Sequence, residues 1–548
     1  MQSRRLRPGA ARNVSVLLAG ASLLASASAA QANVTFTPRV DARAIFSDSV
    51  GGGDDSGVIT VLAPGFSLKA DSRRVKAQAD YEFSRRFAID GDLSEKHRHK
   101  LSARVQSELV RDFLFLNAGG VVTQVMRDLR GAVSADPDAD NNNLSTVSSF
   151  YVSPSFKQDV GSLVNVSGSY RFSYTNLDDP SNFYRESGEN FSLARASDSY
   201  NHAATLTIAN RNPSSRLQWA IRNNFSRDER EDLNEFLRTY TSVLDIDYAL
   251  NRKIHLLGSI GYEDRLDRQD NILTDSTTGL PVLDSDGRLQ IDPAQPRRTV
   301  FDRSGLTWDV GVKLTPSRRT ELTVRGGRQF GDTVFSGSLA FQVREGLKIT
   351  GSYKESLDTF GNLFSGELDG QSFAFMVNEN YRVGPALITV PTENGYAIVA
   401  GSINNATFRS RRAQVQVSYQ RGRNTLTMLG YYDRRTFLDI GRTGDSSTPA
   451  PDPTATGNDD KTWGGSLVFR RQLGQRQSLS VDASYQNSTY ALSRSRQDDF
   501  IGGGISYRMD LSDKLTASIS ARTIHRISNT TGADDQSNSV TLGVRASF

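Results

Sequence analysis

The chain has 548 residues, with 65 Lys and Arg against 61 Asp and Glu, and it contains no cysteine. The absence of cysteine excludes a disulfide framework and a thiolate metal site. The first 32 residues hold four Arg and no acidic residue, so the formal charge of +4 falls to zero without them, and we expect no nucleic-acid partner.

Residues 1–32 have the pattern of a secretory signal peptide. A basic start with four Arg precedes a short apolar core at residues 14–25, and Ala30-Gln31-Ala32 is a small-x-small cleavage site. The apolar core is too short and wrongly flanked for a membrane anchor. We therefore expect residues 1–32 to be cleaved and residues 33–548 to form the mature protein.

The composition and hydropathy of the mature chain are typical of a transmembrane β-barrel rather than of a helical membrane protein. None of its segments is apolar for 18 residues, so we expect no membrane helix. The mean hydropathy is −0.45, and Gly (45 residues) and Tyr (18 residues) are plentiful. Low hydropathy suits a transmembrane barrel, because only every second strand residue meets lipid.

Alternation of apolar and polar residues recurs along the whole mature chain. In residues 164–174, Val, Tyr and Phe side chains share one face, and Asn, Ser and Arg side chains share the other. Residues 306–314, 347–354, 479–486 and 515–522 repeat this pattern. Each segment has about the ten residues that a tilted strand needs to cross a bilayer. We count about 22 such segments, with 20–24 possible, and predict an all-β, antiparallel, up-and-down transmembrane barrel.

The connections between these segments fall into two alternating sets. One set is short and turn-like, at 109–112, 158–161, 251–253, 315–319, 344–346, 420–423, 473–475 and 511–513. The other set is often long and polar, at 127–144, 177–196, 266–303, 358–405 and 437–460. Outer-membrane barrels have short periplasmic turns and longer outer loops, so the short set is predicted to face the periplasm together with both chain ends.

The polar face of the strands supplies the predicted lumen wall. Its charged members carry both signs, which indicates a hydrated pore without a preference for cations or anions. The lumen-facing candidates are Arg171, Arg222, Asp245, Asp247, Asp309, Lys313, Arg325, Lys348, Lys354, Asp482 and Arg522.

No set of residues in the sequence indicates catalysis, a cofactor or a resident metal. His97 and His99 share one face after an acidic stretch, but a polar strand start explains them better than a metal or proton site at the rim. His255 alternates with Ser259 and Glu263, which favours a lumen wall position. We therefore predict a protein that is not an enzyme.

Two of the long connections invite a closer interpretation. Asp136, Asp138 and Asp140 have calcium-loop spacing, but the required Gly and closing Glu are missing, so a bare acidic outer loop is the better prediction than opportunistic calcium. The connection 358–405 contains the apolar runs 373–377 and 386–390. It is predicted to add a hairpin to the wall, giving about 24 strands, or else to fold inward and narrow the pore.

The last strand ends on an aromatic residue. Val540, Leu542 and Val544 alternate with polar residues, and the chain stops at Phe548. This pattern is typical of the terminal strand that the barrel assembly machinery reads during insertion. We therefore assign Val540, Leu542, Val544 and Phe548 as the insertion signal.

Residues 34–50, 62–83, 109–124 and 151–172 carry a family resemblance over roughly the first third of the chain. Their sequences, such as VTFTPRVDARAIFSDSV and YVSPSFKQDVGSLVNVSGSYRF, resemble the outer-membrane β-barrel family associated with the PEP-CTERM/exosortase system. Members of that family are typically found with exopolysaccharide export and exosortase genes. The resemblance implies an envelope barrel for polysaccharide export, and it carries over no catalytic residue.

These observations lead to one expected function and two alternatives. We expect a porin-like transport conduit in the outer membrane of a Gram-negative bacterium, with exopolysaccharide as its cargo. Its expected partners are outer-membrane lipid, lipopolysaccharide, the barrel assembly machinery, exopolysaccharide and the export proteins. The alternatives are a structural or adhesive surface barrel and a barrel-wall hydrolase. An energy-coupled nutrient receptor would need an amino-terminal plug domain, whereas strand alternation here begins almost at the mature start.

Overall fold

The computed structural model describes most of the mature chain. The described residues are 33–48, 56–89, 97–126, 131–136, 138–139, 144–177, 183–187, 190–194, 198–212, 214–231, 234–277, 282, 290–362, 387–392, 395–400, 406–438, 459–490 and 493–548. The expected signal peptide and the apolar run 373–377 lie outside them. Among the described residues, no helix is long and apolar enough to cross a membrane.

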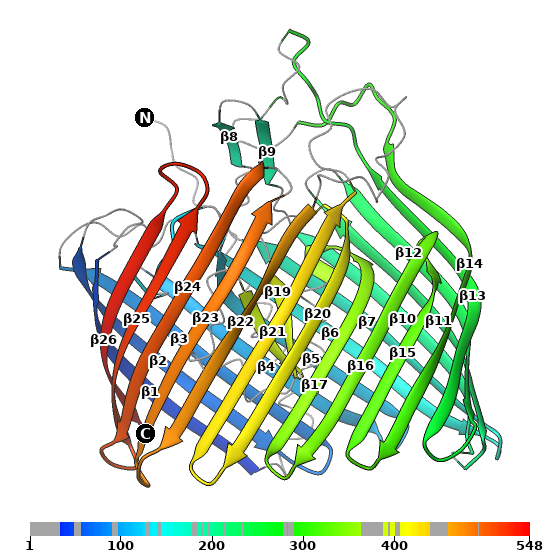
Figure 1. Cartoon of the computed structure of the whole chain (residues 1–548), viewed down its shortest axis with the longest axis horizontal. Helices are drawn as coiled ribbons and strands as arrows, with labels where there is room; N and C mark the ends of the chain where they lie inside the picture. The colour runs from blue at the N-terminus through cyan, green and yellow to red at the C-terminus, as the bar shows by residue number, and fades with distance from the viewer. Residues whose placement is uncertain are drawn as a thin grey trace.

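Twenty-two strands form one antiparallel sheet that closes on itself, because β1 pairs with both β2 and β26 (Figure 1). The predicted fold class and strand number are therefore confirmed. The wall strands are β1 (Asn33–Ser47), β2 (Gly57–Asp71), β3 (Val75–Ala88), β4 (His97–Val110), β5 (Leu114–Met126), β6 (Leu144–Val160), β7 (Val164–Leu177), β10 (Ser199–Asn210), β11 (Leu217–Arg230), β12 (Glu235–Ala249), β13 (Ile254–Gln269), β14 (Arg298–Ser317), β15 (Thr320–Gln329), β16 (Asp332–Arg344), β17 (Leu347–Asp358), β20 (Phe408–Arg421), β21 (Asn424–Phe437), β22 (Asp459–Gln472), β23 (Gln477–Tyr490), β24 (Ser493–Asp510), β25 (Leu515–Ser528) and β26 (Asp535–Ser547).

The two faces of the sheet differ as the alternation predicts. On β14, Leu306 and Val310 are 62% and 61% exposed, whereas the intervening Thr307 is 5% exposed. The exposed residues of such strands are apolar and point away from the barrel, and their neighbours point into the lumen. An apolar outer face removes the cost of contact with hydrocarbon, and the closed ladder leaves no unpaired strand edge.

The seam between β1 and β26 closes the barrel. Its register runs from Arg39 opposite Ser547 to Ser47 opposite Ser539. The backbone N–H of Phe548 donates to the carbonyl of Pro38 over 2.9 Å. On the lumen side, Arg545 Nε donates to Asp41 Oδ1 over 2.6 Å. The last residue of the chain is therefore part of the ladder.

Connections sort by length between the two ends of the barrel, as the sequence predicts (Figure 1). The short turns gather at the lower end of the view, where β1 begins and β26 ends. The tight turn at Phe330 and Gly331, between β15 and β16, is a short connection at the opposite end. Both of its residues have positive φ, 59° and 79°, which suits a two-residue hairpin turn.

The predicted additional wall hairpin is wrong. β18 (Leu387–Thr392) and β19 (Gly395–Ala400) do form a hairpin, but it is a separate two-stranded sheet. β17 pairs directly with β20, so the wall keeps 22 strands. The prediction rested on the apolar runs 373–377 and 386–390, whereas the described hairpin pairs Leu387–Thr392 with Gly395–Ala400, and 373–377 lies outside the described residues. The apolar character of the connection could not tell whether a hairpin would join the wall. A second separate pair consists of β8 (Phe183–Ser187) and β9 (Asn190–Ala194).

We predict that Ile505→Arg and Ser506→Arg have different effects on assembly. Ile505 is 50% exposed on the outward face, and Ser506 is its neighbour on the lumen face. Arg on a lipid face costs about 2–4 kcal/mol near the midplane, whereas the lumen tolerates it. Heat-modifiable gel mobility should show a loss of folded barrel for Ile505→Arg only. Equal folding of the two variants would contradict the assigned faces.

A second prediction concerns sidedness. An epitope inserted at Gly532, between β25 and β26, should bind antibody on intact cells, because this turn lies at the long-loop end. The same epitope at Gly422, between β20 and β21, should be reached only after permeabilisation. Reversed labelling would mean that the barrel is inserted in the opposite direction.

A third prediction concerns the chain end. Removal of Phe548 eliminates its hydrogen bond to Pro38 and the terminal aromatic residue, so the amount of assembled barrel in the outer-membrane fraction should fall sharply. Phe548→Tyr, which keeps an aromatic terminus, is the matched control and should assemble normally. Normal assembly of the deletion variant would refute the assigned insertion signal.

Candidate functional site

The lumen wall is lined by ion pairs between strands. Seven of the eleven candidate residues form such pairs: Arg222 with Asp245 (3.4 Å), Asp309 with Arg325 (2.6 Å), Lys313 with Glu321 (3.1 Å) and Asp482 with Arg522 (3.8 Å). An eighth, Asp247, shares a hydrogen bond of 2.7 Å with the ring of His255. Of the other three, Arg171 lies on the same face of β7 as Ser173, and Lys348 and Lys354 lie exposed on one face of β17. Paired charges of both signs make a hydrated wall without one dominant sign.

One of these pairs depends on a glycine. Asp482 on β23 and Arg522 on β25 lie on either side of Gly504 on β24. A Cβ at Gly504 would lie 2.9 Å from Asp482 Oδ1 and 3.1 Å from Arg522 Cγ. The absence of a side chain at Gly504 therefore lets the two charged groups meet across the middle strand.

Part of the β5–β6 connection folds into the lumen. We call residues 131–136 and 138–139 the first lumen segment. Ala139 is fully buried and packs in a cluster with Ile45, Ile59, Val61 and Ala63 on β1 and β2. Its apolar contacts therefore lie on the inner face of the wall, at the long-loop end.

The carboxylates of the first lumen segment meet cations of the wall. Asp138 is 1% exposed, and its Oδ2 lies 2.9 Å from Arg43 Nη1. Arg98 and Lys100 approach its other oxygen at 3.7 and 3.8 Å. Arg86 donates to the carbonyl of Asp138 over 3.2 Å. A buried carboxylate needs such partners, because an unpaired buried charge is strongly unfavourable.

The same segment also reaches the last strands of the barrel. Thr541 Oγ1 donates to Asp136 Oδ2 over 2.6 Å, and the N–H of Ala135 donates to Ser537 Oγ over 3.0 Å. Four strands separate β26 from β5 in the sheet order. The first lumen segment therefore spans a chord of the barrel opening.

The predicted bare acidic outer loop at residues 136–143 is therefore wrong where the structure describes it. Asp136 and Asp138 are buried and bound to wall residues rather than solvated, whereas Asp140 lies outside the described residues. Among the described residues, no group of three or more His, Asp or Glu side chains could hold a metal ion. The local spacing of the acidic residues could not reveal partners that lie on distant strands.

A second chord is formed by the two ends of the β17–β20 connection, residues 359–362 and 406–407, which we call the second lumen segment. Thr359 Oγ1 donates to Asp228 Oδ2 on β11 over 2.7 Å, although five strands separate β11 from β17 in the sheet. Thr407 Oγ1 donates to Asp267 on β13 and accepts from Arg230 Nη1 over 3.1 Å. These hydrogen bonds join the ends of the β17–β20 connection to β11 and β13, which lie several strands away in the wall.

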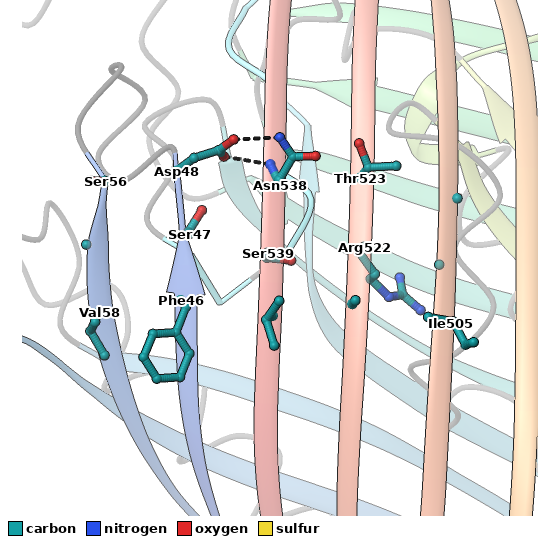
Figure 2. Close-up of a pocket in the computed structure, with 15 residues that line it drawn as sticks. Phe46, Ser47, Asp48, Ser56, Val58, Ile505, Arg522, Thr523, Asn538 and Ser539 are labelled. Atoms are coloured by element: carbon teal, nitrogen blue, oxygen red, sulfur yellow. Dashed lines mark hydrogen bonds between the residues drawn. The ribbon is translucent and has the colours of Figure 1, made fainter.

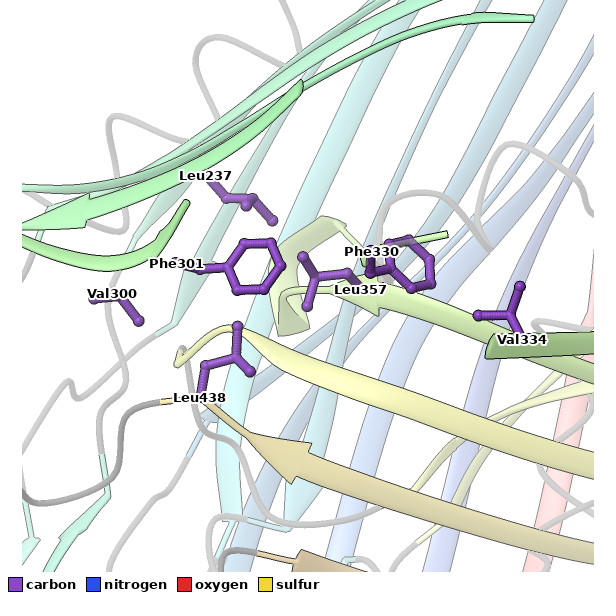
Figure 3. Close-up of a cluster of buried hydrophobic side chains, with 7 residues drawn as sticks. All are labelled: Leu237, Val300, Phe301, Phe330, Val334, Leu357 and Leu438. Carbon is purple, nitrogen blue, oxygen red and sulfur yellow. The ribbon is translucent and has the colours of Figure 1, made fainter. Parts of the chain in front are cut away.

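An apolar cluster lies where the β15–β16 hairpin stops short of its neighbours. β14 pairs with β15 only from Trp308 towards the turn end, so the outer part of β14 has β13 as its ladder partner. Seven side chains from the outer ends of the surrounding strands converge there (Figure 3): Leu237, Val300, Phe301, Phe330, Val334, Leu357 and Leu438. The N–H of Phe330 donates to Glu263 Oε1 over 2.5 Å, which holds the hairpin tip against the lumen wall.

Side-chain hydrogen bonds join β16 to the wall beside this cluster. Arg409 on β20 pairs with Asp332 and, over 2.7 Å, with Glu355 on β17. It also donates to the carbonyl of Thr333 over 3.1 Å. The ladder between β16 and β17 extends outward only to Gly337 and Tyr353. The Arg409 network therefore replaces the backbone pairing that is lost beyond that point.

The histidines take structural positions. β4 begins at His97, as predicted, and the rings of His97 and His99 lie 5.9 and 5.1 Å from that of Phe83. His202 accepts or donates a hydrogen bond with Tyr170 OH over 2.7 Å. These rings form part of an aromatic surface on the outward face. Aromatic residues are typical of the zones where a barrel meets the membrane interfaces.

The outer end of the closing seam carries a groove on the outward face. Figure 2 shows Asn538 bound to Asp48 there through two hydrogen bonds of 2.6 Å. The cavity beside them has a volume of about 840 Å³ and is lined by apolar side chains such as Phe46, Ile505 and Val540. These residues belong to the exposed apolar surface, so the groove faces lipid rather than the lumen.

No protein-family model and no curated protein sequence matches the chain. Solved structures do match its fold. The siderophore receptor PiuA from Acinetobacter baumannii aligns with a TM-score of 0.50 and 9% identity, over 94% of this chain and 82% of that one. The FrpB iron transporter from Neisseria meningitidis (TM-score 0.48, 11% identity) is matched over 94% of this chain and 81% of that one. The ferric-catecholate import receptor Fiu from E. coli K12 (0.47, 10%) is matched over 93% and 81%. The similarity to PiuA shows that this chain shares the β-barrel fold of that protein.

Proposed function

We propose that the protein is an outer-membrane transport barrel of a Gram-negative bacterium and that its cargo is exopolysaccharide. One observation carries the transport part of this proposal, namely the closed 22-stranded wall with an apolar outer face and a polar, ion-paired inner face. Such a wall is stable in a bilayer and can enclose a hydrated path. The fold shared with PiuA, a siderophore receptor, supports transport as the general activity.

Two observations support a polysaccharide cargo. The lumen faces of β6, β7 and β10 are rich in hydroxyl groups, among them Ser149, Ser153, Ser173, Thr175 and Thr205. Ser149 Oγ and Thr175 Oγ1 already bond to each other over 2.9 Å. Ser149, Ser153, Ser173 and Thr175 are buried in the described arrangement, so a sugar chain reaches them only after the groups that cover them have moved. Hydroxyl groups both donate and accept, so they can then exchange partners with the hydroxyl groups of the sugar chain. The resemblance of residues 34–50, 62–83, 109–124 and 151–172 to a family found with exopolysaccharide export genes also supports this cargo.

The two lumen segments give this conduit a gate. Both come from connections at the long-loop end, and both cross the opening through side-chain contacts rather than through the ladder. Side-chain contacts can break while the wall stays closed. We therefore assign the described arrangement to a closed state, in which the segments must move for a polymer to pass.

A structural surface barrel is the second candidate. The buried ion pairs of Asp138 and the hydrogen bonds from Thr359 and Thr407 to the wall are also consistent with a structural barrel whose lumen segments never move. The two candidates differ in whether the lumen segments ever release the wall. That difference can be measured directly.

We predict that a disulfide between the first lumen segment and β26 will hold the conduit closed. Thr541→Cys and Asp136→Cys place two thiols where a 2.6 Å hydrogen bond now joins the side chains, and the protein has no other cysteine. In planar bilayers, the oxidised double variant should conduct less than the same protein after reduction. Each single variant is the control and should be insensitive to reductant.

The outcome separates the two candidate functions. Conductance that rises on reduction, together with lower exopolysaccharide release from cells that carry the oxidised variant, supports a gated conduit. No conductance in the wild type or in the reduced variant would favour the braced structural barrel. If the purified protein conducts normally but a gene-deletion strain releases as much exopolysaccharide as the wild type, the proposed cargo is refuted. The proposal that the protein forms a pore would then still stand.

A further inference from the structure

The two ends of the barrel carry opposite charge. The ten connections at the short-turn end contain twelve Lys and Arg residues and three Asp and Glu residues. In the connections at the opposite end, the side chains that the structure describes include nine Asp and Glu and one Arg, namely Asp48, Asp136, Asp138, Asp198, Glu231, Asp270, Asp275, Asp292, Asp534 and Arg297. The short-turn end therefore has a net formal charge of +9, whereas the described part of the opposite end has an excess of acidic residues.

The cationic end is exposed and largely unneutralised. All twelve basic residues are exposed: Arg73, Arg74, Arg111, Arg211, Arg216, Arg252, Lys253, Arg318, Arg319, Arg423, Arg476 and Lys514. Within the described part of the chain, Arg111, Arg211 and Arg476 pair with carboxylates, and the other nine do not. We call these twelve residues the basic ring.

The spacing of the turns makes the basic ring act as a unit. Strands in a sheet lie about 4.8 Å apart, so consecutive turns, which occur at every second strand gap, lie about 10 Å apart. This is close to the Debye length of about 8–10 Å at physiological salt. The potentials of neighbouring turns therefore overlap, most of all where a turn holds two cations, as at Arg318 and Arg319.

We propose that the basic ring captures an acidic polysaccharide, one that bears carboxylate groups, at the periplasmic mouth of the barrel. This inference rests on the proposed conduit and names the class of its cargo. An extended polyanion contacts several turns at once, and a field of one sign over a pore mouth raises the local concentration and the association rate of its counterion. The acid-rich opposite end repels the same polymer, which favours its release on that side.

The main rival for the basic ring is the anionic lipid of the adjacent leaflet. Lipid anchoring would account for cations at the turns. It gives no reason for the excess of acidic residues in the described connections at the other end, whereas a directional polyanion path uses both ends. The charge asymmetry therefore favours the polymer, and the lipid becomes an outcome of the test.

The test uses the purified full barrel in planar bilayers of neutral phosphatidylcholine. Alginate oligomers, which are polyuronates, are added to one side or the other, with neutral dextran of matched length as the comparison. Insertion is oriented by Gln475→Cys in the β22–β23 turn, which a membrane-impermeant thiol reagent labels from the short-turn side only. We expect alginate to block current from the short-turn side at about one tenth of the concentration needed from the other side, and 1 M salt to abolish the difference.

Charge reversal identifies the residues responsible. Arg318→Glu with Arg319→Glu should remove most of the sidedness, because neither side chain has a described carboxylate partner and the fold should persist. The matched control reverses two basic residues of the long connections, Arg288→Glu with Arg442→Glu, and should keep the sidedness. Dextran block should be unchanged in all three proteins.

The remaining outcomes overturn the inference in distinguishable ways. If alginate blocks equally from both sides and ion conductance is normal, the capture of a polyanion by the basic ring is refuted. The proposed conduit would still stand. If the Arg318 and Arg319 reversal alters only the stability of the barrel in bilayers that contain phosphatidylglycerol, the basic ring binds lipid. No conductance under any condition would refute the proposed conduit itself.

Discussion

Lipid offers no hydrogen-bond partner to a peptide group, and this constraint shapes the whole structure. A sheet that crosses a bilayer must therefore have no free edge, and only a closed sheet meets that condition. The pairing of β1 with β26 provides the closure. Once the wall is closed, alternate side chains face lipid and lumen by geometry alone, which explains the apolar outward residues of β14 and the ion pairs behind them.

Closure also determines how charge can be held inside. Carboxylates and guanidinium groups on the lumen face meet across neighbouring strands, so most pairs are short and local, such as Asp309 with Arg325. The lumen segments also place their charged side chains beside partners on the wall, but these partners lie on strands that are distant in the sheet. Asp138 enters the barrel against three cations, and its charge is compensated although its side chain is almost fully buried. The lumen segments contact the wall through charged and hydroxyl side chains, which water solvates after release, and also through apolar side chains such as Ala139.

The wall could be predicted from the sequence because each of its strands is determined by the pattern of residues within that strand. A period of two over residues 306–314 or 515–522 gives a strand and its two faces, and the parity of short and long connections gives the strand number and the two ends. The contents of the lumen could not be predicted in the same way, because Asp136 and Thr541 are 405 residues apart in sequence and become neighbours only after the barrel has closed. One signal was available: residues 58–63 are apolar almost without interruption, which indicates a strand covered on both faces rather than one that faces water.

The seam has a consequence for biosynthesis. Asp41 and Arg545 are 504 residues apart in sequence and bond to each other across the closing strands. Joining segments this distant costs about 5 kcal/mol in loop-closure entropy, and β1 can complete its pairing only after β26 has been synthesised. A prematurely terminated polypeptide would leave β1 with an open edge in a hydrocarbon environment. A chain that lacks β26 therefore cannot close the barrel and cannot become a stable membrane protein. It stays accessible to periplasmic proteases, so only chains that include β26 persist.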